Sequence, residues 1–267
     1  EATNYEEIWP VRLEKHWRDQ GHDVEIIKAG VPGFDTRKEA KLLERLMPRY
    51  RPHGVLVAFV ANDLFTNKPL VREPAPVSPP TETTPAEPEN ATEGEAVAAD
   101  VITVEHERKR QRNLHVVRWL QRLAIQSDSV YRTVYERTGR ARYFTVPLEP
   151  SVERSLEVTT ELFDHMASTA GDQNISLAVI SLPQLYQVLS LADGPSDGID
   201  PGHIDATMTE RLDMPWVPLA DRLAERYVET GTDLYHRYDG HFTVEGNRAT
   251  AQLLGDLLTP WLETLEP

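Results

Sequence analysis

Two continuous apolar runs constrain the fold of this chain more than any other feature of its sequence. They are Val55-Leu-Val-Ala-Phe-Val60 and Ile175 to Ile180, and each has the length of a strand. Strands that are apolar on both faces are typical of a parallel sheet that helices cover on both sides. The sequence therefore predicts an α/β fold.

Helical and strand-like patterns alternate in the N-terminal part. Trp9, Leu13 and Trp17 fall on one helical face, and Gly21 stands where a helix C-terminus favours glycine. The short apolar run from Val24 to Ile27 follows and predicts a strand.

A second helix is predicted to begin at Thr36, which forms a capping box with Glu39 three residues later. Its leucines face inward, and Pro48 ends it. Because this helix lies between two strand-like runs, the segment has the βαβ pattern of a parallel sheet.

The C-terminal part repeats the alternation. In chain order it predicts helices at 113–125 and 152–168, strands at 175–180 and 216–218, and helices at 220–229 and 244–257. We therefore expect an open three-layer α/β/α sandwich with a parallel, flavodoxin-like sheet.

The segment from Val71 to Asp100 interrupts this pattern. It carries prolines at 74, 76, 79, 80, 85 and 88 among Glu, Thr and Ala, and it contains no aromatic residue. Such a segment cannot bury enough apolar surface to offset the entropy of ordering. We expect one domain formed by residues 1–70 and 101–267, with 71–100 as a disordered insertion. A proline-rich ligand is the alternative interpretation of this insertion.

The charge of the chain excludes two classes of partner. The formal net charge is −15 and the pI is about 5.0, so the field of the protein repels nucleic acid and anionic membranes. The basic run Arg108 to Arg112 lies beside an acidic stretch and is interpreted as the solvated start of a helix. No apolar run approaches the roughly 20 residues of a membrane-spanning helix. We expect neither a nucleic-acid partner nor a membrane-spanning segment.

The chain contains no cysteine, which excludes disulfides, thiolate metal ligands and a cysteine nucleophile. The histidines at 16, 22, 53, 106, 115, 165 and 203 show no metal-ligand spacing. No glycine-rich phosphate loop follows a strand, which argues against a nucleotide-binding doubly wound domain. We expect no metal and no cofactor.

Three polar loops follow or approach the carboxyl edge of the predicted sheet, where ligands bind in folds of this class. The loop Gly30 to Thr36 has two glycines that can present a backbone N–H, and the loop from Asn62 offers a side-chain amide. The third loop holds Asp239 and His241, an acid and a general base. Together they have the composition of an oxyanion hole and an acid–base pair.

The spacing of these loops resembles that of a known family. The elements Ala29-Gly-Val-Pro-Gly33-Phe-Asp-Thr, Val57-Ala-Phe-Val-Ala-Asn62-Asp63 and Asp239-Gly-His241-Phe-Thr-Val-Glu-Gly246-Asn-Arg-Ala resemble the second, third and fifth blocks of SGNH (GDSL-like) hydrolases. The resemblance covers nearly the whole chain apart from the insertion.

The resemblance implies a serine esterase fold. The backbone N–H at Gly33 and the amide of Asn62 would hold the oxyanion, Asp239 would orient His241, and His241 would activate a serine. The first block of the family, Gly-Asp-Ser, does not occur in the chain. Either that serine lies upstream of Glu1 or the domain is inert. Ser181, which follows a predicted core strand, is a weaker candidate nucleophile.

Two departures from the family pattern matter. Val60 stands two residues before Asn62, where the family usually has glycine, and one residue separates Asp239 from His241, where the family usually has two. Asp233-Leu-Tyr-His236 matches the usual spacing, but we prefer the later pair. Thr243 is a good N-cap and Glu245 suits the first turn of a helix, which places His241 in the turn before that helix.

Structural interpretations of the same residues remain open. Gly33 after Pro32 is also a strong turn signal, Asn62 with Asp63 is also a helix cap, and the turn of Asp239 and His241 is also consistent with a surface loop.

We therefore expect a serine esterase or acyl-transferase that acts on a small-molecule or carbohydrate ester, such as an acetylated carbohydrate. The alternative is a non-catalytic SGNH-like domain that binds a carbohydrate or lipid. The oligomeric state is open. An extracytoplasmic location is favoured, with any signal or anchor upstream of Glu1.

Overall fold

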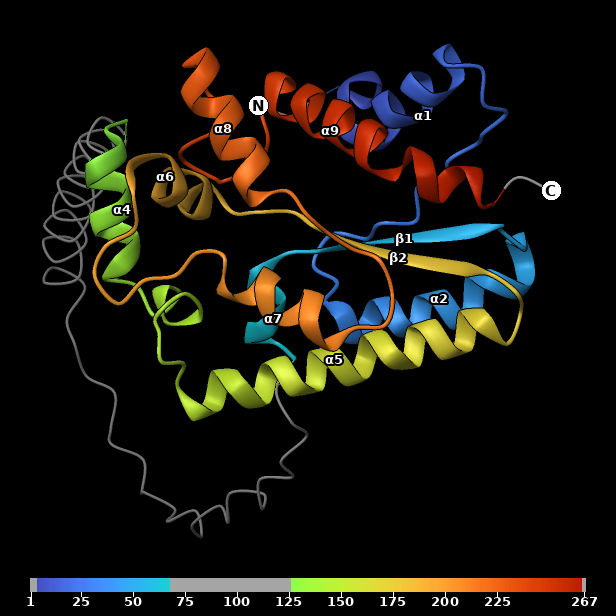
Figure 1. The fold of residues 1–267 in the computed structure, drawn as a ribbon, viewed down its shortest axis with the longest axis horizontal. Helices are drawn as coiled ribbons and strands as arrows, with labels where there is room; N and C mark the ends of the chain where they lie inside the picture. Colours follow the sequence, from blue (N-terminus) through green and yellow to red (C-terminus); the bar gives the residue numbers. More distant parts are fainter. Residues whose placement is uncertain (1–3, 68–125, 266–267) are drawn as a thin grey trace, which may run out of the picture. The chain divides into compact units, whose positions relative to one another are not determined.

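The computed structural model describes residues 4–67 and 126–265 (Figure 1). One compact unit comprises residues 1–69 and 128–267, and it holds every element discussed below. The predicted insertion at 71–100, the basic run at 108–112 and the predicted helix at 113–125 lie outside the described residues.

A parallel sheet of three strands forms the centre of this unit. The strands are β1 (Gly54–Phe59), β2 (Ser176–Ser181) and β3 (Trp216–Pro218), and their order in the sheet is β1-β2-β3. β1 runs beside the whole of β2, whereas β3 pairs only with the carboxyl half of β2. The prediction of an α/β fold with parallel strands at these three places is confirmed.

Helices make up most of the remaining described chain. They are α1 (Trp9–Asp19), α2 (Thr36–Tyr50), α4 (Asp128–Glu136), α5 (Pro150–Gly171), α6 (Leu185–Asp193), α7 (His203–Arg211), α8 (Ala220–Thr230) and α9 (Val244–Glu263). Three short 3-10 helices join them, namely η1 (Tyr5–Glu7), η2 (Ala61–Phe65) and η3 (Ala141–Tyr143). The sequence pattern did not indicate α4, α6 or α7.

One hydrophobic core lies between the sheet and helices α2, α5 and α7. Its centre is an aromatic group in which the ring of Phe59 lies 5.9 Å from that of Phe163 and 5.4 Å from that of Trp216. The rings of Phe163 and Trp216 are 5.8 Å apart and meet edge to face, a favoured aromatic geometry. These contacts fix α5 against β1 and β3, the two outer strands of the sheet.

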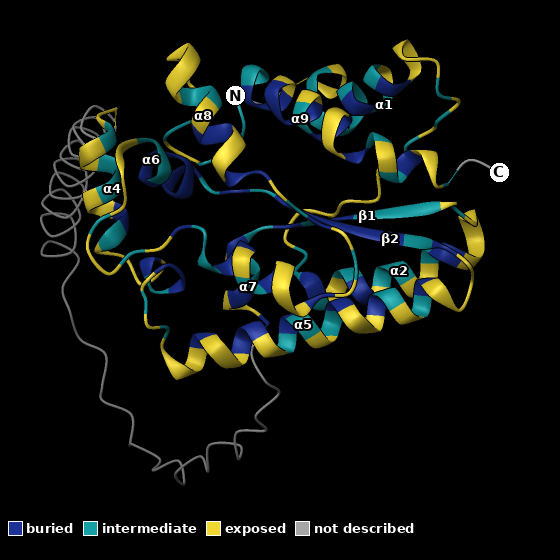
Figure 2. Ribbon diagram, in the orientation of Figure 1, coloured by how far each residue is buried: buried dark blue, intermediate teal, exposed yellow. Residues whose placement is uncertain are grey.

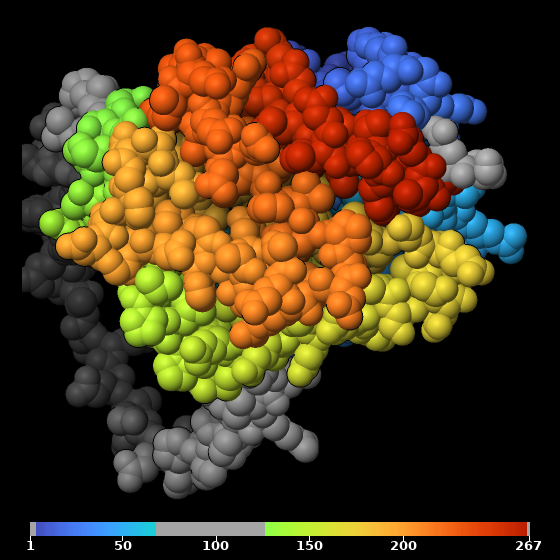
Figure 3. All heavy atoms as spheres, viewed as in Figure 1, coloured from blue at the N-terminus to red at the C-terminus, as the bar shows by residue number. Residues whose placement is uncertain are grey.

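A second core lies on the opposite face of the sheet, under α1, α6, α8 and α9 (Figures 1 and 2). The indole of Trp17 donates to the hydroxyl of Thr259 over 3.1 Å and so links α1 to α9. A side chain at Gly255 would lie 2.2 Å from the ring of His16, so glycine allows this close helix approach. In Figure 3 the segments from α6 onward, orange to red, cover most of the face and hide the sheet.

The run from Val24 to Ile27 is not a strand, which corrects the prediction. Side chains of α1 hold its extended backbone, since Ile26 N donates to Glu14 over 3.0 Å and Arg18 donates to the carbonyl of Val24 over 2.7 Å. Val24 and Ile26 pack against the second core. The backbone of the run is extended, but a strand also needs a backbone partner, and none of the described segments supplies one.

The ends of α2 also differ from the prediction. Asp35, rather than Thr36, is the N-cap, because its carboxylate accepts the N–H of Lys38 over 3.0 Å. Pro48 does not end the helix, which runs on to Tyr50. A proline so close to the C-terminus removes a single backbone hydrogen bond from the last turn.

Asp205 on α7 is a buried carboxyl group between the sheet and its helices. It is 7% exposed, it accepts the indole N–H of Trp216 over 3.1 Å, and it is hydrogen-bonded to Ser181. Burial raises the pKa of Asp205 to about 6. The folded state thus retains a proton on Asp205 that the unfolded chain releases nearer pH 4, so this group costs stability as the pH rises from about 4 to 6 and above.

We predict that Asp205→Asn raises the free energy of unfolding by about 1–3 kcal/mol at pH 8 and by much less at pH 4. The amide keeps an acceptor for Trp216 and removes the buried charge. Thermal unfolding at both pH values measures the effect, with Asp164→Asn on the exposed side of α5 as the control. A variant less stable than the wild type at pH 8 would contradict the assignment of a destabilising charge.

Candidate functional site

The predicted acid and base lie in one tight turn between α8 and α9. Tyr235 and Phe242 form an antiparallel bridge at its base, and His236 N donates to His241 O over 2.8 Å. Gly240 turns the chain with a φ of 75°, a conformation that side chains disfavour, and its N–H donates to His236 O over 2.7 Å. The local sequence therefore closes the turn through its own backbone.

Asp239 and His241 lie side by side within this turn. The distance from Asp239 Oδ1 to His241 Nδ1 is 3.4 Å, and the same oxygen accepts the backbone N–H of His241 over 3.0 Å. That backbone hydrogen bond, with the nearby imidazole, holds the pKa of Asp239 below its ordinary value. The imidazole is 84% exposed. A carboxylate at Nδ1 leaves Nε2 facing outward as the atom that can take a proton.

The competing pair, Asp233 and His236, is arranged differently. Asp233 Oδ1 accepts a hydrogen bond from Arg237 Nη2 over 2.9 Å, so the carboxylate of Asp233 is paired with an arginine. No hydrogen bond joins Asp233 to His236 in the described part of the chain. The geometry therefore favours Asp239 and His241 as the acid and base.

Arg237 anchors the exposed turn to the body of the domain. Its side chain is only 9% exposed, and it pairs with Asp128 at the start of α4 as well as with Asp233. The guanidinium also donates to the hydroxyl of Tyr227 on α8 over 3.1 Å, and that hydroxyl donates to Asp128 over 2.7 Å. The anchor thus joins the turn to α4 and α8.

The turn leads directly into α9, as predicted. Thr243 is the N-cap, because its hydroxyl accepts the N–H of Gly246 over 3.0 Å, and Glu245 lies in the first turn. A side chain at Gly246 would lie 1.9 Å from the carbonyl oxygen of Leu234. Glycine at this position therefore allows the backbone at Leu234 to pack against the first turn of α9.

Gly33 and Asn62 lie on two neighbouring loops at the carboxyl end of β1. Gly33 has a φ of 78° in the turn before α2, and its carbonyl accepts from Lys38 Nζ over 3.1 Å. Asn62 lies in η2, directly after β1, and its side chain is exposed. A hydrogen bond between the side chains of Asp35 and Thr66 links the two loops.

Two partly buried carboxyl groups lie beneath these loops, and sequence reasoning missed them. Burial and the charges of Asp63 and Asp35 raise the pKa of Glu39 to about 7. Burial, together with the charge of Asp35, raises the pKa of Asp63 to about 6, although the backbone N–H of Val60 opposes this shift. No local pattern marks this cluster, because its members come together only when α2 packs beside η2.

Within residues 4–67 and 126–265, no group of acids and histidines is arranged to hold a metal ion.

The described structure shows no direct bond between the two halves of the predicted site. No hydrogen bond or ion pair there joins the turn of Asp239 and His241 to Gly33 or Asn62. Ser181 is 5% exposed and hydrogen-bonded to Asp205, so its hydroxyl takes part in the core. The site residues therefore stay predictions. Their clearest structural feature is the contact between Asp239 and His241.

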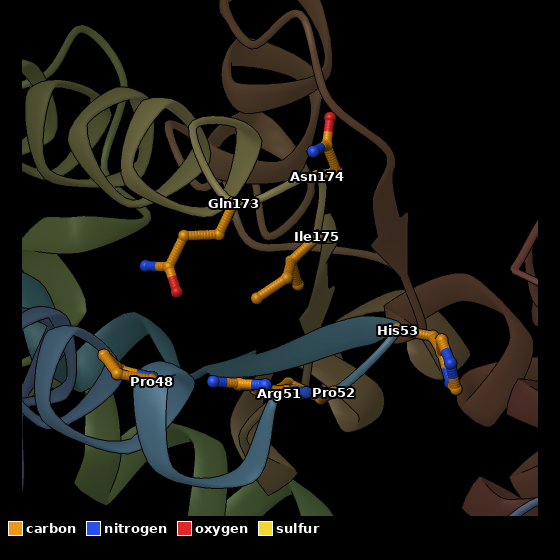
Figure 4. Close-up of a pocket in the computed structure, with 7 residues that line it drawn as sticks. All are labelled: Pro48, Arg51, Pro52, His53, Gln173, Asn174 and Ile175. Atoms are coloured by element: carbon orange, nitrogen blue, oxygen red, sulfur yellow. The ribbon is translucent and has the colours of Figure 1, made fainter.

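A surface hollow lies at the opposite, amino ends of β1 and β2 (Figure 4). Arg51 and Asn174 line it with left-handed backbones, at the end of α2 and in the turn before β2. Figure 4 shows His53 and Asn174 pointing away from Gln173. Because its polar side chains do not converge, we do not regard this hollow as the functional site.

Comparison with known protein families, with curated proteins and with solved structures finds no match to this chain. Within the described residues, every helix is too short or too polar to cross a membrane.

We predict that Arg237→Gln lowers the free energy of unfolding by about 2 kcal/mol or more, because it leaves Asp128 and Asp233 without their cation. Exchange of the His241 amide with solvent should also accelerate as the turn loosens. Chemical denaturation and hydrogen exchange measure the two effects.

The matched control is Arg248→Gln, which breaks a solvent-exposed pair with Glu245 on α9. Its expected cost is below about 1 kcal/mol. Equal losses in the two variants, or unchanged exchange at His241 in Arg237→Gln, would show that Arg237 does not anchor the turn.

Proposed function

We propose that this chain is most of an SGNH-type serine esterase or O-acyl-transferase domain with a three-layer α/β/α sandwich. The parallel sheet with a hydrophobic core on each face supports this architecture. The order of the Gly33 loop, the Asn62 loop and the Asp239–His241 turn along the chain supports the family.

One observation supports the proposal most directly: the upstream end of the described chain is held beside the turn of the base. Trp9 N donates to the side chain of Asn247 over 2.9 Å, and the amide of Asn247 donates to Thr243 O over 2.9 Å. Thr243 follows His241 by two residues. Residues 4–8 therefore approach the domain near the start of α9, and His241 lies in the turn just before that start. This placement suits a nucleophilic serine upstream of Glu1.

The outer edge of β1 provides a place for the strand that would carry this serine. Among the described residues, β1 pairs only with β2, so its other edge has unpaired backbone groups. Such an edge readily accepts a further strand. A parallel strand there would end at the same side of the sheet as Asn62.

The proposed mechanism is acyl transfer through an acyl-enzyme. His241 Nε2 takes the proton of the serine hydroxyl, whose oxygen attacks the ester carbonyl, while Asp239 holds Nδ1. The N–H of Gly33 and the amide of Asn62 donate to the resulting oxyanion, each contributing about 2.7–4 kcal/mol by analogy with other sites. His241 then protonates the leaving alcohol, and water or a second alcohol releases the acyl group, such as acetate from a carbohydrate.

A non-catalytic domain that binds a carbohydrate or lipid is the second candidate. The observation that favours it is the high exposure of His241, whose Nε2 has no hydroxyl partner in the described structure. The experiment below separates the two candidates.

We predict that the full-length protein reacts with a fluorophosphonate probe, and that His241→Ala slows labelling by about 10²–10⁴-fold because the general base is lost. His236→Ala in the same turn should label at close to the wild-type rate. Gel fluorescence and mass spectrometry of the labelled peptide give the rate and the serine.

A full-length protein that stays unlabelled would favour the binding domain. Labelling that is equal in wild type and His241→Ala would exclude His241 as the base, and labelling at Ser181 would exclude an upstream nucleophile.

A further inference from the structure

One face of α2 consists almost entirely of basic residues. Successive residues of an α-helix are about 100° apart around its axis, so a sector of about 120° on α2 holds six side chains. They are Arg37, Lys38, Lys41, Arg45, Pro48 and Arg49. No acid falls in this sector, although the chain has 43 acidic and only 28 basic residues. This basic face is therefore a local concentration of positive charge on a chain of net charge −15.

The basic face is open to solvent, and most of its charges have no counter-charge. Lys41, Arg45 and Arg49 are exposed, and no acid within residues 4–67 and 126–265 forms an ion pair with any of the three. The side chain of Arg49 lies over the ring of Tyr50, with 5.3 Å from the guanidinium centre to the ring centroid. These three cations are thus available to an anion from outside the chain.

The acids around the basic face do not neutralise it. Glu44 on α2 is engaged with His165 on the neighbouring helix α5 over 2.8 Å, and Glu39 is half-buried (Figure 1). In the part of the chain that the structure describes, no acid of α5 pairs with a base of α2. The exposed acids of α5 are Glu153, Glu157, Glu161 and Asp164. The basic face is therefore narrow, with an acidic helix beside α2.

The shape of the basic face favours a linear anionic partner. Residues 37, 41, 45 and 49 are all basic, so a positive charge recurs about every 6 Å along the helix axis. A flat anionic membrane or a duplex nucleic acid would also meet the acids of α5 and the negative field of the whole protein. Single-stranded nucleic acid is held by stacking on aromatic rings, but Tyr50, the one aromatic residue of α2, lies outside the 120° sector.

We propose that the basic face of α2 binds a linear acidic polysaccharide, whose carboxylates pair with the row of lysine and arginine side chains. Arginine matches a carboxylate in geometry, and charge-assisted hydrogen bonds are the strong ones. Pro48 is the only apolar side chain on this face, whereas protein partners are usually bound through buried aromatic or aliphatic anchors. The inference goes beyond the esterase proposal and does not depend on it, because binding requires no nucleophile.

The position of the basic face relates this binding to the candidate site. Lys38 Nζ donates to the carbonyl oxygen of Gly33 over 3.1 Å, and α2 begins three residues after Gly33. A polysaccharide bound along α2 would therefore extend from the Gly33 loop toward the amino end of β1.

The test measures the binding of polygalacturonate, which carries one carboxylate on each sugar, to the full-length protein by isothermal titration calorimetry. The triple variant Lys41→Gln, Arg45→Gln, Arg49→Gln should bind about 10-fold more weakly or worse at low salt. The slope of log K against log salt concentration should fall by about 2, since each charge contact with a single-stranded polyanion contributes about 0.7. Glutamine has nearly the helix propensity of lysine and arginine, so α2 should stay folded.

Two controls accompany this measurement. The triple variant Arg137→Gln, Arg154→Gln, Arg211→Gln removes the same charge at exposed positions outside α2 and should bind like the wild type. Fully methyl-esterified polygalacturonate has the same backbone without its charges and should not bind.

Three results would overturn the proposal. The first is the absence of saturable binding to polygalacturonate, or equal binding of its methyl ester. The second is an equal loss of affinity in both triple variants, which would assign binding to the overall charge of the protein. The third is tighter binding to phosphatidylglycerol vesicles or to oligothymidylate than to polygalacturonate, which would assign the basic face to another class of anion.

Discussion

The rest of the structure depends on the burial of β2 on both faces. Ala178, Val179 and Ile180 are completely buried, and successive residues point to opposite cores. Val179 joins the core under α2 and α5, whereas Ala178 and Ile180 join the core under α1 and α9. Because β2 is the middle strand, β1 and β3 take their positions from it. The positions of the strands in turn fix the positions of the loops that follow them, including η2 with Asn62.

This constraint explains what the sequence predicts well. A strand buried on both faces must be apolar throughout, so 55–60 and 175–180 are visible without any knowledge of their neighbours. The start of α9 is equally local, since Thr243 caps the helix through the N–H of Gly246, only three residues further on. The turn of Asp239 and His241 is short enough for its spacing to be read from the chain, and the structure closes it through backbone bonds within six residues.

Features that depend on distant partners could not be predicted in the same way. The run from Val24 to Ile27 has the apolar character of a strand, but its backbone bonds go to Glu14 and Arg18. The anchor of the turn that holds Asp239 and His241 joins Arg237 to a residue 109 positions away. The proximity of Glu39 to Asp63 similarly requires α2 and η2 to be packed together. In each case the contact forms only in the tertiary structure, so no local periodicity or motif predicts it.

The acids beneath the two loops bear on the proposed chemistry. An oxyanion held by Asn62 would be opposed by negative charge on Asp63, the next residue, and on Glu39. Burial raises the pKa of both groups, to about 6 and about 7, so near neutral pH the pair retains part of its protons. Deprotonation at higher pH adds charge beside the oxyanion donors, while the base requires a neutral imidazole. The same burial that packs α2 against η2 therefore limits the negative charge at the site.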